Sequence, residues 1–317
     1  MNRQRILVLG GSGFVGRHVC EQLVRAGHLV TVPTRRTNRA ASVQTLPGLT
    51  VLESKAFDAS TLAGLMAGHD AVVNLIAVLH GDEDRFERMH VQLPQQIAAA
   101  MRQAGVSRLV HVSALGADPQ GPSMYQRSKA GGETALQGQG LDLTVLRPSV
   151  IFGAEDKFLN LFADLQQIAP LVPLAGSGTR FQPVWVVDVA AAIVRCLQDR
   201  STIGLTYEAC GPEVFTLGEL VRRAGQWAGV NEGRGRPVIP LPRWVGWLQA
   251  LAMEMLPGEP LMSRDNLASM QVDNVASGQM PGLQALGIAP AALSGVAPTY
   301  LGRRGPRSRL AGWRASH

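Results

Sequence analysis

The chain has 317 residues, of which 46% are hydrophobic and 17% charged, a composition that is typical of a folded globular protein and argues against a disordered one. Its net charge of +6 includes five arginines in residues 303–317, a stretch without acidic residues, so the remainder carries +6 − 5 = +1. The excess charge belongs to a tail and not to a face of the fold, which argues against a nucleic-acid-binding protein.

The N-terminal half alternates short apolar runs with longer amphipathic ones. Because buried parallel strands read as near-continuous runs of Val, Ile and Leu, the short runs predict strands and the longer ones helices. The predicted strands are Arg5–Leu9, Leu29–Val32, Leu49–Glu53, Ala71–Ala77, Leu109–Val112 and Leu143–Arg147. The predicted helices are Phe14–Ala26, Ser60–Ala67, Phe86–Ala104 and Tyr125–Gln137. This alternation predicts an α/β fold with a Rossmann-type, doubly wound parallel sheet.

The alternation weakens after Pro148. The sequence here predicts strands at Val184–Val187 and Tyr207–Ala209, a loop over Ala169–Gly178, and helices at Phe158–Gln167, Asp188–Gln198 (capped by Asp188) and Leu217–Ala228. We therefore expect a Rossmann domain in residues 1–153, to which 184–210 return, and a smaller interwoven C-terminal lobe. That lobe comprises 154–183 and 211–302, and 303–317 form a basic tail, either disordered or a weak electrostatic tether to phosphate-rich surfaces.

A glycine-rich run, GGSGFVG over residues 10–16, joins the first predicted strand to the first predicted helix. Gly10 permits a tight turn, Gly13 lets the backbone approach a pyrophosphate, and Gly16 lets helix and strand pack closely. The helix N-terminus adds unpaired N–H groups and a partial positive charge. The sequence therefore predicts a dinucleotide site that includes Gly10, Ser12, Gly13, Phe14, Val15 and Gly16.

Arg35 and Arg36 follow the second predicted strand. A protein that selects NAD usually has an acidic residue here, which accepts hydrogen bonds from the ribose hydroxyls. Two arginines favour a 2′-phosphate, so we expect NADP(H) as the preferred dinucleotide and NAD(H) as the alternative; a solvated loop with incidental charge would also account for the pair. Asp58 either bonds the adenine edge or caps the following helix, since Ser60 and Thr61 lie beside it.

Tyr125 and Lys129 form a Y-x-x-x-K pair on a predicted helix. Residues at i and i+4 share one helical face, so the lysine can hold a ribose and lower the pKa of the phenol. Such a tyrosine is a usable general acid or base. As a bare pattern, the pair is equally consistent with the exposed start of an amphipathic helix.

Four further segments carry a family resemblance: 112–117 (VSALGA), 147–160 (RPSVIFGAEDKFLN), 182–189 (QPVWVVDV) and 263–266 (SRDN). With the two motifs above, the chain resembles the extended or atypical short-chain dehydrogenase/reductase superfamily. Within it, the chain is similar to the NADPH-binding accessory subunits of respiratory complex I and their bacterial homologues. The resemblance extends from about residue 3 to about residue 300.

The resemblance implies roles for individual residues. Contacts with the dinucleotide are implied for Gly10, Gly13, Gly16, Arg35, Asp58, Asn74, Ala77, Lys129 and Pro148. Tyr125 matches the catalytic tyrosine. Related enzymes usually place their catalytic Ser or Thr where this chain has Ala114, so Ser113 would serve only from a position shifted by one residue. The usual Asn on the helix after the fourth strand is replaced by His90, as a substitute polar group or as a core histidine.

Two functions follow from these patterns. The resemblance implies tightly bound NADP(H) in a structural or sensing role, in the respiratory chain or in quinone metabolism. The alternative is an NADPH-dependent oxidoreductase or epimerase-type enzyme that uses Tyr125 and Lys129 on a carbonyl or quinone-like substrate. Expected partners are the dinucleotide, a hydrophobic or quinone-like small molecule, and a respiratory-chain or membrane-associated protein.

The remaining features bear on location. Cys20, Cys196 and Cys210 lie far apart without metal-like spacing, which predicts a reducing compartment and no metal site. The strand pattern that starts near Ile6 predicts no signal peptide, and no apolar run has the ~20 residues that a membrane-spanning helix needs. We expect a cytoplasmic protein or one peripheral to the inner face of the membrane. The apolar segment Arg243–Leu256 predicts a buried helix or, alternatively, a membrane-interface, quinone-binding or partner-docking segment.

Overall fold

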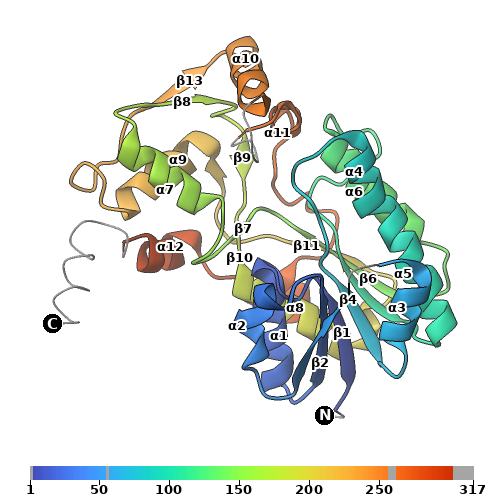
Figure 1. The fold of residues 1–317 in the computed structure, drawn as a ribbon. Helices are drawn as coiled ribbons and strands as arrows, with labels where there is room; N and C mark the ends of the chain where they lie inside the picture. Colours follow the sequence, from blue (N-terminus) through green and yellow to red (C-terminus); the bar gives the residue numbers. More distant parts are fainter. Residues whose placement is uncertain (1–2, 55–56, 256–261, 303–317) are drawn as a thin grey trace, which may run out of the picture. The chain divides into compact units, whose positions relative to one another are not determined.

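The computed structural model describes residues 3–54, 57–255 and 262–302, which fall into two compact units (Figure 1). Met1–Pro148, Val186–Ala209 and Ser277–Ala289 contribute to the first unit. The described residues of Ser149–Trp185, Cys210–Ala276 and Pro290–His317 form the second. The predicted tail, 303–317, lies outside the described residues.

The first unit contains a seven-stranded parallel sheet. Its strand order is β11(Thr206–Ala209)-β6(Asp142–Pro148)-β5(Arg108–Val112)-β4(Ala71–Asn74)-β1(Arg5–Leu9)-β2(Leu29–Thr34)-β3(Leu49–Glu53). Because the order reverses at β1, successive crossovers run in opposite directions across the sheet and place helices on both faces. The predicted Rossmann-type fold is therefore confirmed.

Two groups of helices cover the sheet. The first group, α3(Ala59–Met66), α5(Leu93–Ala104) and α6(Met124–Leu136), shares one apolar core cluster with β1, β4 and β5. In the second group, α1(Phe14–Arg25) packs along α8(Val186–Gln198), and α2(Ala41–Gln44) also contacts α1. The predicted helix over Phe86–Ala104 is interrupted, because α4(Glu83–Glu87) continues into a π-helical turn, Arg88–Gln92, before α5.

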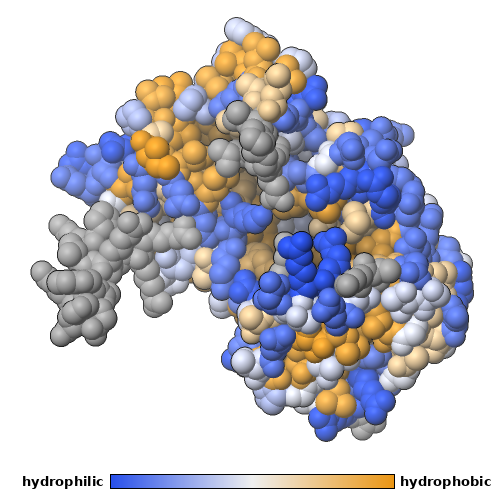
Figure 2. Space-filling model, viewed as in Figure 1, coloured by the Kyte–Doolittle hydropathy of each residue, from blue (hydrophilic) through white to orange (hydrophobic). Residues whose placement is uncertain are grey.

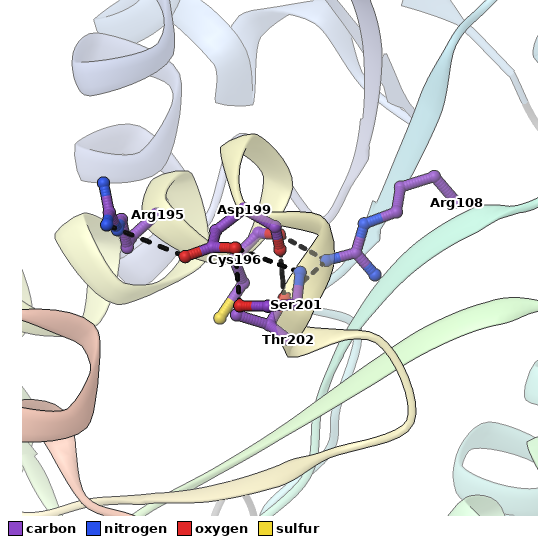
Figure 3. Close-up of polar contacts among 6 residues, drawn as sticks. All are labelled: Arg108, Arg195, Cys196, Asp199, Ser201 and Thr202. Carbon is purple, nitrogen blue, oxygen red and sulfur yellow. Dashed lines mark hydrogen bonds and ion pairs between the residues drawn. The ribbon is translucent and has the colours of Figure 1, made fainter.

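A buried arginine fixes the end of α8 to the sheet (Figure 3). Arg108, at the amino-terminal end of β5, donates to the carbonyl oxygens of Asp142 (2.6 Å) and Cys196, and to Thr202 Oγ1 (3.1 Å). A cation at this position also opposes the partial negative charge of the helix C-terminus. Because Arg108 and Ser113 lie at opposite ends of β5, this cluster is structural and separate from the predicted nucleotide site.

The second unit is built from short strand pairs and helices. The pairs are β7(Ile151–Phe152) with β10(Val184–Trp185), β9(Arg180–Phe181) with β12(Phe215–Thr216), and β8(Val172–Ala175) with β13(Val238–Leu241). The helices are α7(Leu159–Ile168), α9(Leu217–Trp227), α10(Arg243–Glu254), α11(Arg264–Ser269) and α12(Leu293–Leu301). Phe152, Leu159, Leu220 and Leu293 contribute to its core.

Two local predictions in the second half of the chain were wrong. Ala169–Gly178 is not a loop throughout, because β8 pairs in parallel with β13, a partner more than sixty residues away along the chain. The strand predicted at Val184–Val187 ends at Trp185, and α8 begins at Val186. Asp188 consequently lies in the first turn of α8 and not at its cap.

The division into units differs from the predicted domains at three places. Residues 149–153 fall in the second unit, the returning segment starts at Val186, and Ser277–Ala289 belongs to the first unit. This last assignment has a clear physical cause. The Glu208 N–H in β11 donates to the Pro281 carbonyl (3.0 Å), and the Ser277 N–H donates to Glu208 Oε2 (2.7 Å).

Candidate dinucleotide site

The glycine-rich run forms a tight loop between β1 and α1. Gly10 adopts a positive φ of 83°, a conformation that glycine adopts without strain. The Gly13 N–H donates to the Gly10 carbonyl oxygen (3.0 Å), which closes the turn. A Cβ on Gly16 would meet the Gly10 carbonyl oxygen and lie 2.6 Å from Gly11 Cα, so this position requires glycine.

The N-terminus of α1 is suited to an anion. Its N-cap residue, Gly13, is exposed and supplies no side chain to bond the first-turn N–H groups, and the first turn has no acidic residue. Ser12, Phe14 and Val15 around it are half-buried. Unpaired N–H groups together with the positive end of the helix dipole fit a phosphate.

The segment after β4 lies against this loop. An added Cβ on Gly10 would be 3.2 Å from Leu75, whose N–H donates to the Leu9 carbonyl (2.9 Å). Asn74 is buried, and its Oδ1 accepts the Ile76 N–H (3.1 Å), which turns the chain away from the strand. Ala77, three residues on, is exposed. The structure thus brings the Asn74–Ala77 stretch beside the glycine loop.

Arg35 and Arg36 follow β2 directly and are exposed. Thr34 Oγ1 donates to the Arg36 carbonyl (3.1 Å) and accepts the Arg36 N–H (3.4 Å), which folds the chain into a turn at the end of β2. The two guanidinium groups therefore belong to a short turn at the carboxyl edge of the sheet, where nucleotides bind in open α/β sheets.

Asp58 caps α3. Its carboxylate accepts the Thr61 N–H (2.9 Å) and the Ser60 hydroxyl (2.7 Å), and these bonds lower the pKa of Asp58 to about 2. Of the two roles that the sequence left open, the structure gives the cap. A contact between Asp58 and an adenine edge stays a prediction.

The Y-x-x-x-K pair lies in the first half of α6, which begins with a capping box formed by Ser123 and Gln126. Lys129 is buried, and its Nζ donates to the Val112 carbonyl (3.0 Å) at the end of β5. Desolvation lowers the pKa of Lys129 to about 8 and raises the pKa of Tyr125 to about 12. The phenol therefore stays protonated at neutral pH.

Two rings from the interrupted helix enclose Tyr125. The ring centroids of Phe86 and His90 lie 6.1 Å and 5.7 Å from that of Tyr125, both in edge-on arrangement. His90 Nε2 accepts the Val78 N–H (3.0 Å), so its Nδ1 carries the proton and donates to Ser128 Oγ (2.9 Å). Burial lowers the pKa of His90 to about 3, which keeps the ring neutral. His90 is thus a hydrogen-bonded core histidine that also packs on Tyr125.

Ser113 extends β5 beyond its last regular residue. Its N–H donates to the Leu146 carbonyl (2.8 Å), and the Leu115 N–H donates to the carbonyl of the buried Pro148 (2.8 Å). Within the described part of the chain, the buried Ser113 hydroxyl has no hydrogen-bond partner. A buried polar atom without a partner is unfavourable, so this hydroxyl is suited to bond a ligand.

The sequence motifs assign no role to His111, although the structure makes it part of this cluster. His111 is buried in β5, and its Nδ1 bonds Asn74 Nδ2 (3.1 Å) on β4. Burial, with Lys129 and His90 nearby, holds the pKa of His111 well below its usual value. A single histidine within the apolar run of a buried strand is the signal that could have identified it.

A nicotinamide dinucleotide fits the residues present. The glycine loop presents backbone without side chains, the α1 N-terminus has no side-chain cap, and the Ser113 hydroxyl is buried without a partner among the described residues. Among the described residues, no cluster of three or more His, Cys, Asp or Glu is placed to hold a metal ion. No helix in the same part of the chain is long and apolar enough to cross a membrane.

Residues 10–200 match the model of the NAD(P)H-binding family, and the chain belongs to this family. Its cofactor is therefore a nicotinamide dinucleotide. More particularly, the chain is 35% identical to NADH dehydrogenase [ubiquinone] 1 alpha subcomplex subunit 9 of Mus musculus, over 90% of this chain and 76% of the relative. It is 31% identical to the same subunit of Arabidopsis thaliana, over 93% and 76%.

The fold also matches solved structures. The dTDP-glucose 4,6-dehydratase DesIV from Streptomyces venezuelae, solved with NAD bound, superposes with a TM-score of 0.74 at 23% identity. The match covers 98% of each chain. At this identity the likeness shows a shared fold alone. The predicted similarity to the accessory subunits of respiratory complex I is confirmed by the 35% identity to subunit 9.

Proposed function

We propose that this chain holds NADP(H) at the carboxyl edge of its sheet, chiefly as a structural or sensing ligand. The uncapped N-terminus of α1 behind the glycine loop carries the proposal, because a helix N-terminus of this kind can bind a pyrophosphate through backbone N–H groups alone. Bound NADP(H) would stabilise the folded chain by mass action, by about 4 kcal/mol at a thousandfold excess over its dissociation constant.

Individual residues would have distinct roles toward the dinucleotide. Gly10, Gly13 and Gly16 shape the loop that receives the pyrophosphate, Lys129 donates to a ribose, and Asp58 reaches the adenine edge. Asn74, Ala77 and Pro148 line the remaining wall. A bound, reduced nicotinamide would be a potential hydride donor, and the chain's own residues would bind it, orient it and exclude water.

The protonation states disfavour the oxidation of an alcohol by the bound dinucleotide, because that reaction needs a general base. Near pH 7 the Tyr125 phenol and the Lys129 ammonium are both protonated, while His90 is neutral and bonded at both nitrogens. None of these groups can accept a proton readily at that pH. The identity to subunit 9 supports a respiratory-chain partner for the loaded protein. That partner would place the protein in the respiratory chain or in quinone metabolism, peripheral to the inner face of the membrane.

The arginine pair supports a preference for NADP(H) over NAD(H). We expect wild-type protein to bind NADPH more tightly than NADH, and Arg35→Ala/Arg36→Ala to weaken NADPH binding about ten- to a hundredfold while NADH binding stays unchanged. Titration by NADPH fluorescence measures both affinities. Arg25→Ala, an exposed arginine in the last turn of α1, is the control and should change neither. Equal affinities of the wild type for the two cofactors would contradict the preference.

One observation favours a second function, an NADPH-dependent reductase. The buried, unpartnered Ser113 hydroxyl could bond a substrate carbonyl, and the protonated Tyr125 could donate its phenolic proton to the same oxygen as a hydride reaches the carbon. Lys129 would then hold the ribose.

Single-turnover oxidation of bound NADPH separates the two functions. In the holding function, NADPH stays reduced against a panel of quinones, aldehydes and ketones. Oxidation that occurs in wild-type protein and is lost in Tyr125→Phe, with NADPH affinity retained, would instead establish the reductase. Oxidation that persists in Tyr125→Phe would remove this tyrosine from the chemistry.

A further inference from the structure

A buried ion pair joins α6 to β6 beside the Y-x-x-x-K pair. The Arg147 guanidinium donates from Nε to Glu133 Oε1 (2.9 Å) and from Nη2 to Glu133 Oε2 (2.6 Å). Glu133 follows Lys129 by four residues on the same helix. Figure 2 shows hydrophilic residues gathered over α4 and α6, whereas Glu133 and Lys129 are only 4% and 2% exposed. These two charges therefore belong to the interior of the first unit.

The lysine and the glutamate are neighbours, yet each has another partner. Residues at i and i+4 lie side by side on a helix. Burial lowers the pKa of Lys129, and the negative charge of Glu133 opposes that effect. Lys129 Nζ nevertheless donates to the Val112 carbonyl (3.0 Å), which uses one of its three N–H donors. Both carboxylate oxygens of Glu133 accept from Arg147 instead.

Arg147 remains a cation in this cluster. Its hydrogen bonds to Glu133 raise the pKa of Arg147, and the negative charges of Glu208 and Asp118 add to this effect. Glu208 lies opposite Arg147 in the pairing of β11 with β6. The guanidinium group therefore stays charged over the whole pH range in which Lys129 titrates.

The other titratable groups around Lys129 are neutral near pH 7. Burial, together with the charge of Lys129, lowers the pKa of His90 to about 3 and holds that of His111 well below its usual value. Burial raises the pKa of Tyr125, one turn earlier on α6, to about 12. Glu133 is thus the carboxylate whose charge acts on Lys129.

We propose that Arg147 is a positioning residue for the nucleotide site, because it holds the Glu133 carboxylate and leaves the Lys129 ammonium group available to the dinucleotide. A buried carboxylate without a partner is unfavourable, so Glu133 without Arg147 would attract the neighbouring Lys129. A charge-assisted bond between these two groups would compete with the bond from Nζ to a ribose. The inference rests on the proposed binding of NADP(H), in which Lys129 donates to the ribose.

The first test is NADPH affinity of the full chain near pH 7, measured by fluorescence titration. Arg147→Met should weaken binding about tenfold or more, because Glu133 then competes for Lys129. Arg147→Met/Glu133→Gln should return the affinity to within about threefold of the wild type, since a neutral amide forms no competing ion pair. The matched control, Arg25→Met, breaks the exposed pair between Arg25 and Glu21 on α1 and should leave the affinity unchanged.

The pKa of Lys129 gives a second readout that requires no ligand. The chain has three lysines, Lys55, Lys129 and Lys157, so isotopically labelled lysine gives few NMR signals, and Lys129→Met identifies the relevant one. From about 8 in the wild type, this pKa should rise in Arg147→Met and fall in Glu133→Gln. Both variants lose the same ion pair, so a merely structural role would shift the pKa in the same direction in both.

Three results would overturn the inference: wild-type affinity in Arg147→Met, a folded double variant that binds NADPH as weakly as Arg147→Met, or pKa shifts of the same sign in the two single variants. Urea unfolding shows which variants are folded. If Arg147→Met is unfolded, the double variant, which leaves no carboxylate at position 133, must still bind as the wild type does. If the wild type binds no NADPH, the proposed function fails, and the signs of the two pKa shifts alone confirm or contradict the hold of Arg147 on Glu133.

Discussion

Gly16→Ala is expected to weaken NADPH binding about a hundredfold and to lower the free energy of unfolding by roughly 1–3 kcal/mol. The new methyl group would lie 2.6 Å from Gly11 Cα and would meet the Gly10 carbonyl oxygen. Both are backbone atoms, so no side chain can rotate away. The loop would have to shift, and it is the element that receives the pyrophosphate. Fluorescence titration and urea unfolding measure the two effects.

Gly64→Ala is the matched control. Gly64 lies within α3, and an added Cβ there would have no heavy atom within 4 Å. Alanine is favoured over glycine inside a helix, so this variant should be slightly more stable and should bind NADPH as the wild type does. A Gly16→Ala protein with wild-type affinity would show that the loop is not the pyrophosphate site.

Lys129→Met is expected to raise the stability of the nucleotide-free chain and at the same time to weaken its binding of NADPH. Burial lowers the pKa of Lys129 from its ordinary 10.5 to about 8. At pH values below 8, keeping the buried lysine charged costs the folded state about 1.4 kcal/mol for each unit by which its pKa is lowered. Methionine removes this cost but leaves the Val112 carbonyl without the bond from Nζ. The nucleotide-free variant should therefore be about 1–2 kcal/mol more stable at pH 7, while it binds NADPH more weakly.

The pH dependence gives a second readout for Lys129. Between pH 8 and 10.5 the unfolded lysine holds a proton that the folded one has lost, so the unfolded state binds more protons and stability rises with pH. Urea unfolding across this range should show the rise in the wild type relative to Lys129→Met. Arg127→Met, an exposed cation on the same helix, should behave as the wild type does. Parallel pH curves for wild type and Lys129→Met would contradict the perturbed pKa.

The fold of the first unit could be predicted because its strands and turns are determined by residues that are close together in the sequence. The Ile6–Leu9 run is buried on both faces, and the following glycines determine the turn without reference to distant residues. In contrast, β8 contains Pro173 and precedes Gly176, so its composition resembles a loop. It becomes a strand only because β13 supplies its hydrogen-bond partners. The sequence of β8 by itself does not predict this pairing.

The candidate site likewise has a part that the sequence predicts and a part that depends on contacts between distant residues. The glycine loop and the Y-x-x-x-K pair are short motifs, whereas the surroundings of Tyr125 depend on the π-helical turn at Arg88–Gln92. That turn helps to place His90 against the tyrosine, and a sequence periodicity of 3.6 residues cannot predict it. The bond between His111 and Asn74 likewise depends on the register of β5 against β4.

Because Ser277–Ala289 belongs to the first unit, that unit cannot finish folding until this segment has been synthesised. The chain passes between the units five times, after residues 148, 185, 209, 276 and 289. β11 is the edge of the sheet, and residues 277–282 cover part of that edge through the bonds to Glu208. A nascent chain therefore exposes an open strand edge until residues near 289 have left the ribosome. The nucleotide-binding unit, whose motifs lie within residues 10–129, is therefore completed only after residues 277–289 have been synthesised.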